Sequence, residues 1–232
     1  MNVYIIVEGD RTETNVYPAW LDILVPSLKR VYRKEDLCDG NYYLFSGHGI
    51  PSIYDHIAAA IEDINAINAT GTVTIDYLMV CMDTEDGSRE DILQEIEASL
   101  DALNIKLNPP CSLEVFEHKV SMESWFLGNV RLLSSNTQSA KLRTYRAFYD
   151  VRSNDPEMMD NIDSEKFHSK AQFHYSYLKE IFKENNITYS KSKPDEVCKK
   201  HYLSRLIDRY EKSGHIASFG HWYEFVTTKF QP

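Results

Sequence analysis

The sequence predicts an α/β protein with a mostly parallel sheet flanked by helices, followed by a helical C-terminal portion. Apolar segments of strand length alternate with amphipathic segments of helix length over roughly the first 125 residues, which favours parallel strands joined by right-handed crossovers. Tyr77–Met82 is an almost unbroken apolar run, typical of a central strand buried on both faces. After about residue 136 only helical patterns remain.

Four strands are expected, each ending in a polar or glycine-containing turn. They are Asn2–Val7, Tyr42–Phe45, Thr72–Met82 and Ser112–Phe116. Helical periodicity follows the first three strands. Asp10 and Glu13 have the spacing of a capping box, and Ser52 and Ser88 are favourable N-cap residues for the next two helices.

The C-terminal portion is expected to be helical. The segments Phe167–Phe182, Val197–Tyr210 and Ile216–Val226 repeat apolar residues at helical spacing. The polar segment Ser134–Gln138 precedes them and is typical of a linker. We therefore expect an α/β domain over residues 1–135 and a helical portion over residues 136–232 packed on it.

Composition places the chain among cytoplasmic globular proteins. Hydrophobic residues make up 43% and charged residues 26% of its 232 residues, an ordinary globular balance. Apolar runs fall short of the ~20 residues needed to cross a bilayer, and the first residues lack the basic n-region of a signal peptide. The four cysteines are scattered, which argues against a zinc site or a disulfide framework.

Charge is unevenly distributed along the chain. Residues 1–140 hold 9 Lys/Arg and 22 Asp/Glu, a balance of −13, whereas residues 141–232 hold 16 and 13, a balance of +3. An acidic first part argues against simple electrostatic binding of nucleic acid. It remains compatible with a metal site, because carboxylates attract cations and the cations attract phosphates.

Acidic residues follow three of the predicted strands. Glu8 follows the first strand, Asp83, Glu85 and Asp86 follow the third, and Glu123 lies just beyond the fourth. Ligands of open α/β sheets bind at the carboxyl ends of the strands. Alternation places Asp83 and Glu85 on one side of an extended segment, where like charges repel unless a cation lies between them. The pattern predicts a Mg²⁺ or Mn²⁺ site.

Each acid also has an ordinary explanation. Glu-Gly-Asp after a strand is commonly a turn, and acids in the Asp83–Asp86 segment complement the dipole of the following helix. Only their joint occurrence at successive strand ends favours a site.

Two motifs carry a resemblance to a known superfamily. Ile5–Asp10 with Glu13 resembles the first motif of the TOPRIM superfamily, which includes topoisomerases, primases, OLD-family nucleases and small ribonucleases. Val80–Glu85 resembles its second motif, an apolar strand that ends in Asp-x-Asp. More narrowly, Met122–Leu127 and the late Ser218-Phe219, with Trp222 and Phe225, resemble an uncharacterised bacterial TOPRIM-like group whose members are thought to accompany ATPases in defence against phage.

The resemblance implies a Rossmann-like TOPRIM sheet and roles for the strand-end acids. Glu8 would be a general acid or base or a metal ligand, Asp83 and Glu85 would hold Mg²⁺ or Mn²⁺, and Glu123 would be an additional acid near the metal. The second motif usually has aspartate where this chain has Glu85, so the second ligand from this segment is either Glu85 or Asp86.

Metal-dependent phosphodiester hydrolysis of nucleic acid, DNA or RNA, is the predicted function. The chain lacks the cysteine cluster of primases and the length for the tyrosine domain of a topoisomerase, so a nuclease remains, with an ATPase as the expected partner in antiviral defence. Lys191 and Lys193, in a polar break between two helices, are candidate phosphate contacts.

Two other functions compete with hydrolysis of nucleic acid. A haloacid-dehalogenase phosphatase needs its Asp-x-Asp after the first strand, where this chain has Glu8-Gly9-Asp10. A catalytically weak binding or sensor module that docks on an ATPase is the alternative outside enzymes, and the net charge of −10 suits it.

Overall fold

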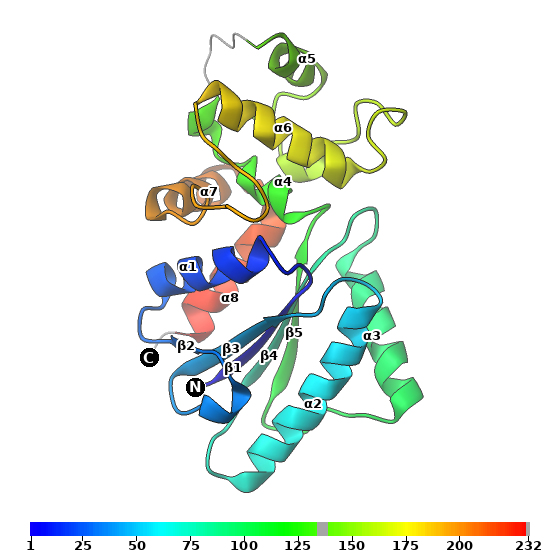
Figure 1. The fold of residues 1–232 in the computed structure, drawn as a ribbon, viewed down its shortest axis with the longest axis vertical. Helices are drawn as coiled ribbons and strands as arrows, with labels where there is room; N and C mark the ends of the chain where they lie inside the picture. Colours follow the sequence, from blue (N-terminus) through cyan, green and yellow to red (C-terminus); the bar gives the residue numbers. More distant parts are fainter. Residues whose placement is uncertain (134–138, 231–232) are drawn as a thin grey trace. The chain divides into compact units, whose positions relative to one another are not determined.

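The computed structural model describes residues 1–133 and 139–230, and it confirms the α/β class (Figure 1). Five parallel strands form one sheet in the order β2-β3-β1-β4-β5. The strands are β1 (Val3–Val7), β2 (Lys29–Val31), β3 (Asn41–Ser46), β4 (Tyr77–Asp83) and β5 (Ser112–His118). Because β1 is flanked by β3 and β4 in parallel register, the carboxyl ends of these strands lie at one edge of the sheet.

The described residues contain eight α-helices and three short 3₁₀ turns. The helices are α1 (Glu13–Leu24), α2 (Ser52–Thr70), α3 (Arg89–Leu103), α4 (Met122–Phe126), α5 (Ala140–Phe148), α6 (Lys170–Glu184), α7 (Lys200–Ser213) and α8 (Ala217–Lys229). The 3₁₀ turns are η1 (Lys34–Asp36), η2 (Val130–Leu132) and η3 (Pro156–Met158). In the part of the chain that the structure describes, no helix is both long and apolar enough to cross a membrane.

The chain divides into two compact units, and each unit is built from segments that are not continuous in the sequence. We call the first the sheet unit, which comprises Met1–Met82, Ser88–Glu117 and the C-terminal segment from Phe225. We call the second the helical unit, which comprises Asp83–Gly87 and His118–Glu224. The boundary expected between residues 135 and 136, and the linker expected at Ser134–Gln138, lie outside the described residues.

The two faces of the sheet have separate cores within the sheet unit. Even-numbered strand residues, such as Tyr4, Ile6 and Val80, pack with apolar side chains of α2 and α3 in one buried cluster, and Figure 1 shows both helices along that face. Odd-numbered residues of β1 and β4 point to the opposite face by strand alternation, and they are equally buried. The double burial explains the continuous apolar pattern of β4.

Aromatic side chains dominate the interior of the helical unit. Trp125 of α4, Phe173 and Tyr177 of α6, and Phe219 of α8 are all fully buried. Trp125 contacts Phe219 with ring centroids 5.5 Å apart, and Phe173 lies 5.9 Å from Tyr177. The residues that carry the narrower resemblance, around Trp125 and Ser218, therefore pack against one another.

Several local expectations are revised. The capping box expected from Asp10 and Glu13 does not form, because α1 begins at Glu13 and the Glu13 carboxylate accepts a hydrogen bond from the Gly9 amide instead. The capping expected at Ser88 is confirmed by a complete capping box with Asp91. β4 begins at Tyr77 rather than at Thr72, and β5 extends two residues beyond Phe116.

Candidate metal site

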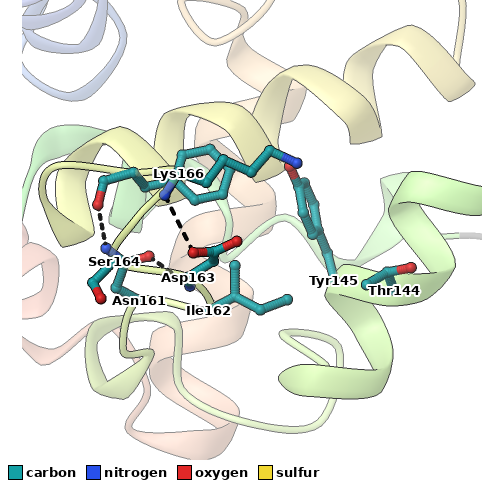
Figure 2. A pocket seen from close by; sticks show the side chains of 8 residues that line it. Thr144, Tyr145, Asn161, Ile162, Asp163, Ser164 and Lys166 are labelled. Atoms are coloured by element: carbon teal, nitrogen blue, oxygen red, sulfur yellow. Dashed lines mark hydrogen bonds between the residues drawn. The ribbon is translucent and has the colours of Figure 1, made fainter.

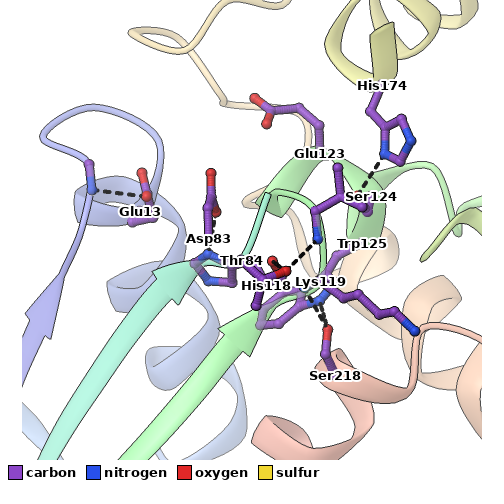
Figure 3. Close-up of polar contacts among 12 residues, drawn as sticks. Glu13, Asp83, Thr84, His118, Lys119, Glu123, Ser124, Trp125, His174 and Ser218 are labelled. Atoms are coloured by element: carbon purple, nitrogen blue, oxygen red, sulfur yellow. Dashed lines mark hydrogen bonds and ion pairs between the residues drawn. The ribbon is translucent and has the colours of Figure 1, made fainter. Parts of the chain in front are cut away.

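The last residues of β4 and β5 form an acid–imidazole pair (Figure 3). Asp83 ends β4 and His118 ends β5, and Asp83 Oδ1 lies 2.7 Å from His118 Nδ1. The imidazole is fully buried, whereas the Asp83 side chain keeps 22% of its surface exposed. The pair is therefore anchored on the histidine side and accessible on the carboxylate side.

Backbone pairing beyond the strand ends holds this pair in place. The Thr84 amide donates to the carbonyl of His118 over 3.1 Å, and the Glu85 amide donates to the carbonyl of Val120 over 3.1 Å. The Thr84 hydroxyl accepts from the Val120 amide over 3.0 Å. Because the two segments stay hydrogen-bonded past the sheet, the Asp83 and His118 side chains leave a rigid backbone.

Glu123 of α4 is the second buried acid of this region. Its side chain is only 3% exposed, and Lys191 Nζ lies 3.9 Å from its Oε1. The Tyr189 hydroxyl donates to the same oxygen over 3.4 Å. The structure thus brings together two residues that the sequence named separately, the acid after the fourth strand and a lysine of the polar break.

The electrostatics of Asp83 show the effect of this arrangement. Burial, followed by the negative charge of Glu123, raises the pKa of Asp83 to about 8. The positive charge of Lys191 opposes this rise, and Glu85 adds weakly to it. A nearby cation stabilises the ionised form of such a carboxyl group, because it offsets the repulsion between the carboxylates that raises the pKa. Asp83 and His118 therefore belong to an acidic and histidine group compatible with a bound metal ion.

Glu8 lies on the sheet unit and is fixed mainly through its backbone. Its amide donates to the carbonyl of Cys81 over 3.0 Å and its carbonyl accepts from the Gly49 amide over 3.0 Å. Burial and the Glu95 carboxylate, and more weakly Glu8, raise the pKa of the Tyr54 hydroxyl on α2. The charge of Glu8 therefore acts on the face of the sheet that α2 covers.

Glu13 is a buried acid on the opposite face of the sheet. Its Oε1 accepts the Gly9 amide over 3.0 Å, and a Cβ at Gly9 would lie 2.8 Å from the same oxygen, so a larger residue there would force the Glu13 carboxylate to move. Burial raises the pKa of the Cys81 thiol to about 12, and the charge of Glu13 adds to this. By strand alternation Asp83 projects on the same face of β4 as Cys81.

The remaining acids of the loop after β4 are exposed. Asp86 forms an ion pair with Lys170, whose Nζ lies 3.1 Å from Asp86 Oδ1 and 3.7 Å from Asp160 Oδ1. Glu85 has a positive φ of 50°, and its charge contributes to the raised pKa of Asp83. Of the two alternatives for a second ligand from this loop, the electrostatics favour Glu85.

The two lysines proposed as phosphate contacts sit in a tight turn. The Lys193 amide donates to the carbonyl of Ser190 over 2.9 Å, and both lysines are exposed. Lys191 lies beside Glu123, and its Nζ also lies 6.0 Å from the centre of the Tyr175 ring. Lys191 therefore lies close to the candidate site through Glu123, whereas the contacts that position Lys193 are backbone hydrogen bonds with Ser190.

A Ser–His pair in the helical unit is structural. Ser124 Oγ lies 2.8 Å from His174 Nδ1, and His174 Nε2 lies 2.8 Å from the carbonyl of Met159. Both side chains are fully buried, and burial lowers the pKa of His174 to about 4. A neutral imidazole that donates from Nε2 to the carbonyl and accepts from the hydroxyl satisfies both groups without access for a substrate.

A pocket of about 530 Å³ between Thr144 and Phe167 offers no comparable chemistry (Figure 2). Its most polar group, the Asp163 carboxylate, accepts the amides of Glu165 and Lys166 over 3.0 and 3.2 Å. These are bonds of the loop to itself, as expected for a turn.

Sequence reasoning missed His118 as a candidate ligand. His118 was overlooked because the predicted strand stopped at Phe116, although a histidine at the end of a buried strand lies at the ligand-binding edge. No protein-family model, curated protein or solved structure matches the chain. The TOPRIM resemblance therefore stays a prediction.

Proposed function

We propose that the protein is a divalent-cation-dependent nuclease that hydrolyses phosphodiester bonds of nucleic acid. The observation that carries this proposal is the Asp83–His118 pair at the ends of β4 and β5, 2.7 Å apart, with the pKa of Asp83 raised to about 8. An acid in such surroundings is a strong candidate for a functional site.

Asp83 and His118 are the first two ligands in this proposal. Both atoms could bind one divalent cation, because Asp83 Oδ1 and His118 Nδ1 lie only 2.7 Å apart and carboxylate oxygen and imidazole nitrogen are both metal-ligand types. A bound cation would replace the direct hydrogen bond between them.

Glu85 is the third proposed ligand, because its charge contributes to the raised pKa of Asp83. The charges of Glu8 and Glu13 act instead on Tyr54 and Cys81 of the sheet unit. Two carboxylates and one imidazole suit Mn²⁺ better than Mg²⁺, because imidazole favours transition metals whereas carboxylate and water suit both ions.

When bound, the cation would polarise a phosphoryl oxygen and lower the pKa of a water ligand. The protein itself would supply the groups that accept a proton and contact the phosphate. Glu123 is held by Tyr189 and lies close enough to influence Asp83, so it can accept a proton near the cation. Lys191, beside Glu123 and 54% exposed, can approach a phosphate oxygen. The substrate class and an ATPase partner in antiviral defence are taken from the TOPRIM resemblance.

Hydrolysis is the first test. Purified protein is incubated with DNA and RNA substrates, with Mn²⁺, with Mg²⁺ and with EDTA, alone and together with a candidate ATPase partner. We expect metal-dependent cleavage that Asp83→Asn lowers about 10²–10⁴-fold or more, because it removes a ligand charge. Asp101→Asn, on the exposed surface of α3, is the matched control and should cleave like the wild type. Cleavage by Asp83→Asn at the wild-type rate would refute the assignment.

Metal binding is the second test, and it does not need a substrate. A ligand at 100 times its Kd stabilises a fold by about 2.7 kcal/mol, which corresponds to roughly 5–10 °C in Tm for a chain of this length. Saturating Mn²⁺ should therefore raise the Tm of the wild type and of Asp101→Asn, but not that of Asp83→Asn. A metal-dependent shift without cleavage of any substrate would support the binding or sensor module instead.

A further inference from the structure

A hydrogen-bonded chain of side chains runs behind His118 within the helical unit. Ser218, in the first turn of α8, lies at its centre (Figure 3). The Trp125 indole donates from Nε1 to Ser218 Oγ over 2.6 Å, and the Lys119 amide donates to the same oxygen over 3.3 Å. Ser218 Oγ in turn donates to Glu157 Oε1 over 2.5 Å.

This arrangement uses the full hydrogen-bonding capacity of the serine hydroxyl. A hydroxyl has one proton to donate and two lone pairs to accept with, and Ser218 has two donors and one acceptor around it. The Ser218 amide also donates to Glu157 Oε1 and Oε2 over 3.3 and 3.4 Å. Removing either Glu157 or Ser218 would therefore leave buried polar groups without their partners.

Trp125 links this chain to the candidate site. Its ring meets the His118 imidazole edge to face, with centroids 4.6 Å apart and an interplanar angle of 87°. Phe219 packs behind the indole at 5.5 Å. With its Nε1 bonded to Ser218, the indole can neither rotate nor shift without losing a hydrogen bond. The imidazole is thus confined between the Asp83 carboxylate and a fixed aromatic ring.

We propose that Glu157, Ser218 and Trp125 are positioning residues that hold the His118 imidazole in the orientation required to bind a metal ion. This inference rests on the proposed function, because it assigns His118 as a ligand. Groups that orient a metal ligand tune its geometry and affinity even though they do not touch the ion. A purely structural role would also need these hydrogen bonds to be satisfied. It would not require the series of contacts from Glu157 through Ser218 and Trp125 to end at the His118 imidazole.

Three substitutions test the chain at successive steps. Glu157→Gln keeps the volume but weakens the acceptor for Ser218, and Ser218→Ala removes the central hydroxyl. Trp125→Phe keeps an aromatic ring against His118 but removes the Nε1 donor. Ser176→Ala is the matched control, because Ser176 pairs with the Tyr145 hydroxyl over 3.1 Å in the same unit without reaching His118.

Two measurements are made on each full-length variant. Titration calorimetry with Mn²⁺ should show about 10-fold weaker binding, or more, in the three test variants and unchanged binding in Ser176→Ala. Imidazole ¹⁵N NMR of the metal-free protein should show a fixed His118 tautomer in the wild type and in the control, and line broadening or averaged tautomers in the test variants.

The outcomes separate this inference from the proposed function. Unchanged Mn²⁺ affinity and an unchanged His118 spectrum in folded Glu157→Gln and Trp125→Phe would overturn the positioning role, even if Ser218→Ala failed to fold. If the wild type binds no metal, the proposed function fails, and the NMR spectra of the metal-free variants still decide whether these residues orient His118. A changed spectrum with wild-type Mn²⁺ affinity would also count against the inference, because the orientation would not matter for binding.

Discussion

Asp83 and Glu157 are both partly or fully buried acids of the helical unit, and the difference between them lies in their neighbours. Glu157 accepts hydrogen bonds from the hydroxyl and the amide of Ser218. Asp83 meets the His118 imidazole on one side and the charge of Glu123 on the other. The first environment satisfies a carboxylate with neutral donors, whereas the second concentrates negative charge. This contrast is why we assign a structural support role to Glu157 and a ligand role to Asp83.

The pH dependence of stability should reveal the buried charge of Glu157. Burial raises the pKa of Glu157 from 4.5 to about 7; the Ser218 hydrogen bond and Lys119 oppose the rise, and Asp155 adds to it. The native state therefore holds a proton more tightly than the unfolded state between these values. The associated stability is fully present below pH 4.5 and is lost as pH rises through 7. It amounts to about 3 kcal/mol at most, from 1.36 kcal/mol per pKa unit.

Urea denaturation of the wild type and of Glu157→Gln at pH 5 and pH 8 measures this effect. The difference in free energy of unfolding between the two proteins should change by up to about 3 kcal/mol between these pH values. The wild type should lose more stability than Glu157→Gln on going to pH 8. The comparison with the variant is needed because His174, whose pKa is lowered to about 4, has the opposite dependence and gains stability as pH rises. Parallel pH profiles of the two proteins would show that Glu157 is not buried as a titrating group.

At the scale of elements, α7 and α8 approach so closely that only glycine fits at one position. A Cβ at Gly220 of α8 would overlap the Tyr210 ring of α7. We expect Gly220→Ala to destabilise the protein by about 1–3 kcal/mol, as overpacking does, although alanine is the better helix former. Guanidinium denaturation of Gly220→Ala, Tyr210→Ala and the double variant tests this. The double variant should be more stable than the sum of the two single effects predicts.

If the losses of stability in Gly220→Ala and Tyr210→Ala simply added in the double variant, the Tyr210 ring would move aside freely when a Cβ is present at position 220. The ring can move aside only if it gives up the hydrogen bond of 2.6 Å that the Tyr210 hydroxyl donates to Glu224 Oε1. Tyr210→Phe, which removes only that bond, therefore serves as the control for the ring itself.

The elements that the sequence predicted well are those with strong local patterns. β1, β3, β4 and β5, together with α2, α3, α6, α7 and α8, fall where apolar periodicity placed them. β2 was missed because Lys29–Val31 is three residues long and not fully buried at any position, so no alternation is visible. α5 was missed because it buries only Leu142 and Tyr145, too few positions to establish a period.

The candidate site was predicted in part, and the reason is geometric. Asp83 was named because it directly follows the most apolar strand. His118 depends on the exact end of β5, and strand ends are the least reliable part of a sequence prediction. The face of the sheet on which the charges of Glu8 and Glu13 act was also unpredictable, because it depends on the register of β1 and β4 and on the start of α1.

At the scale of the whole molecule, the two units share the chain in alternating segments. The sheet unit takes its last segment from Phe225 onward, after the entire helical unit. Sequence patterns could not predict this exchange, because α8 is a single uninterrupted helix from Ala217 to Lys229. A helix that begins in one unit and ends in the other makes the stability of the sheet depend on the far C-terminal part of the chain.

Removal of residues 225–232 should therefore loosen the sheet selectively. Phe225 packs on Tyr77 of β4 and on Phe116 of β5, with ring centroids 5.3 and 5.1 Å away, and Phe230 lies 5.9 Å from Tyr77. Loss of a large aromatic side chain from a packed site costs about 3–5 kcal/mol. Hydrogen exchange should show faster exchange of the β4 and β5 amides in the shortened chain, while the amides of α6 keep their protection.

Phe230→Ala in the full chain is the milder variant, because Phe230 is buried and lies just beyond the end of α8 at Lys229. It should change exchange in β4 and β5 in the same direction but by less than the truncation. Tyr223→Ala, a substitution in the part of α8 that belongs to the helical unit, is the control and should leave the sheet amides protected. If the truncated chain kept wild-type protection in β4 and β5, the C-terminal segment would not be part of the sheet unit in solution. If instead every helix and strand lost protection together, the two units would unfold as one, and the division of the chain would have no energetic meaning.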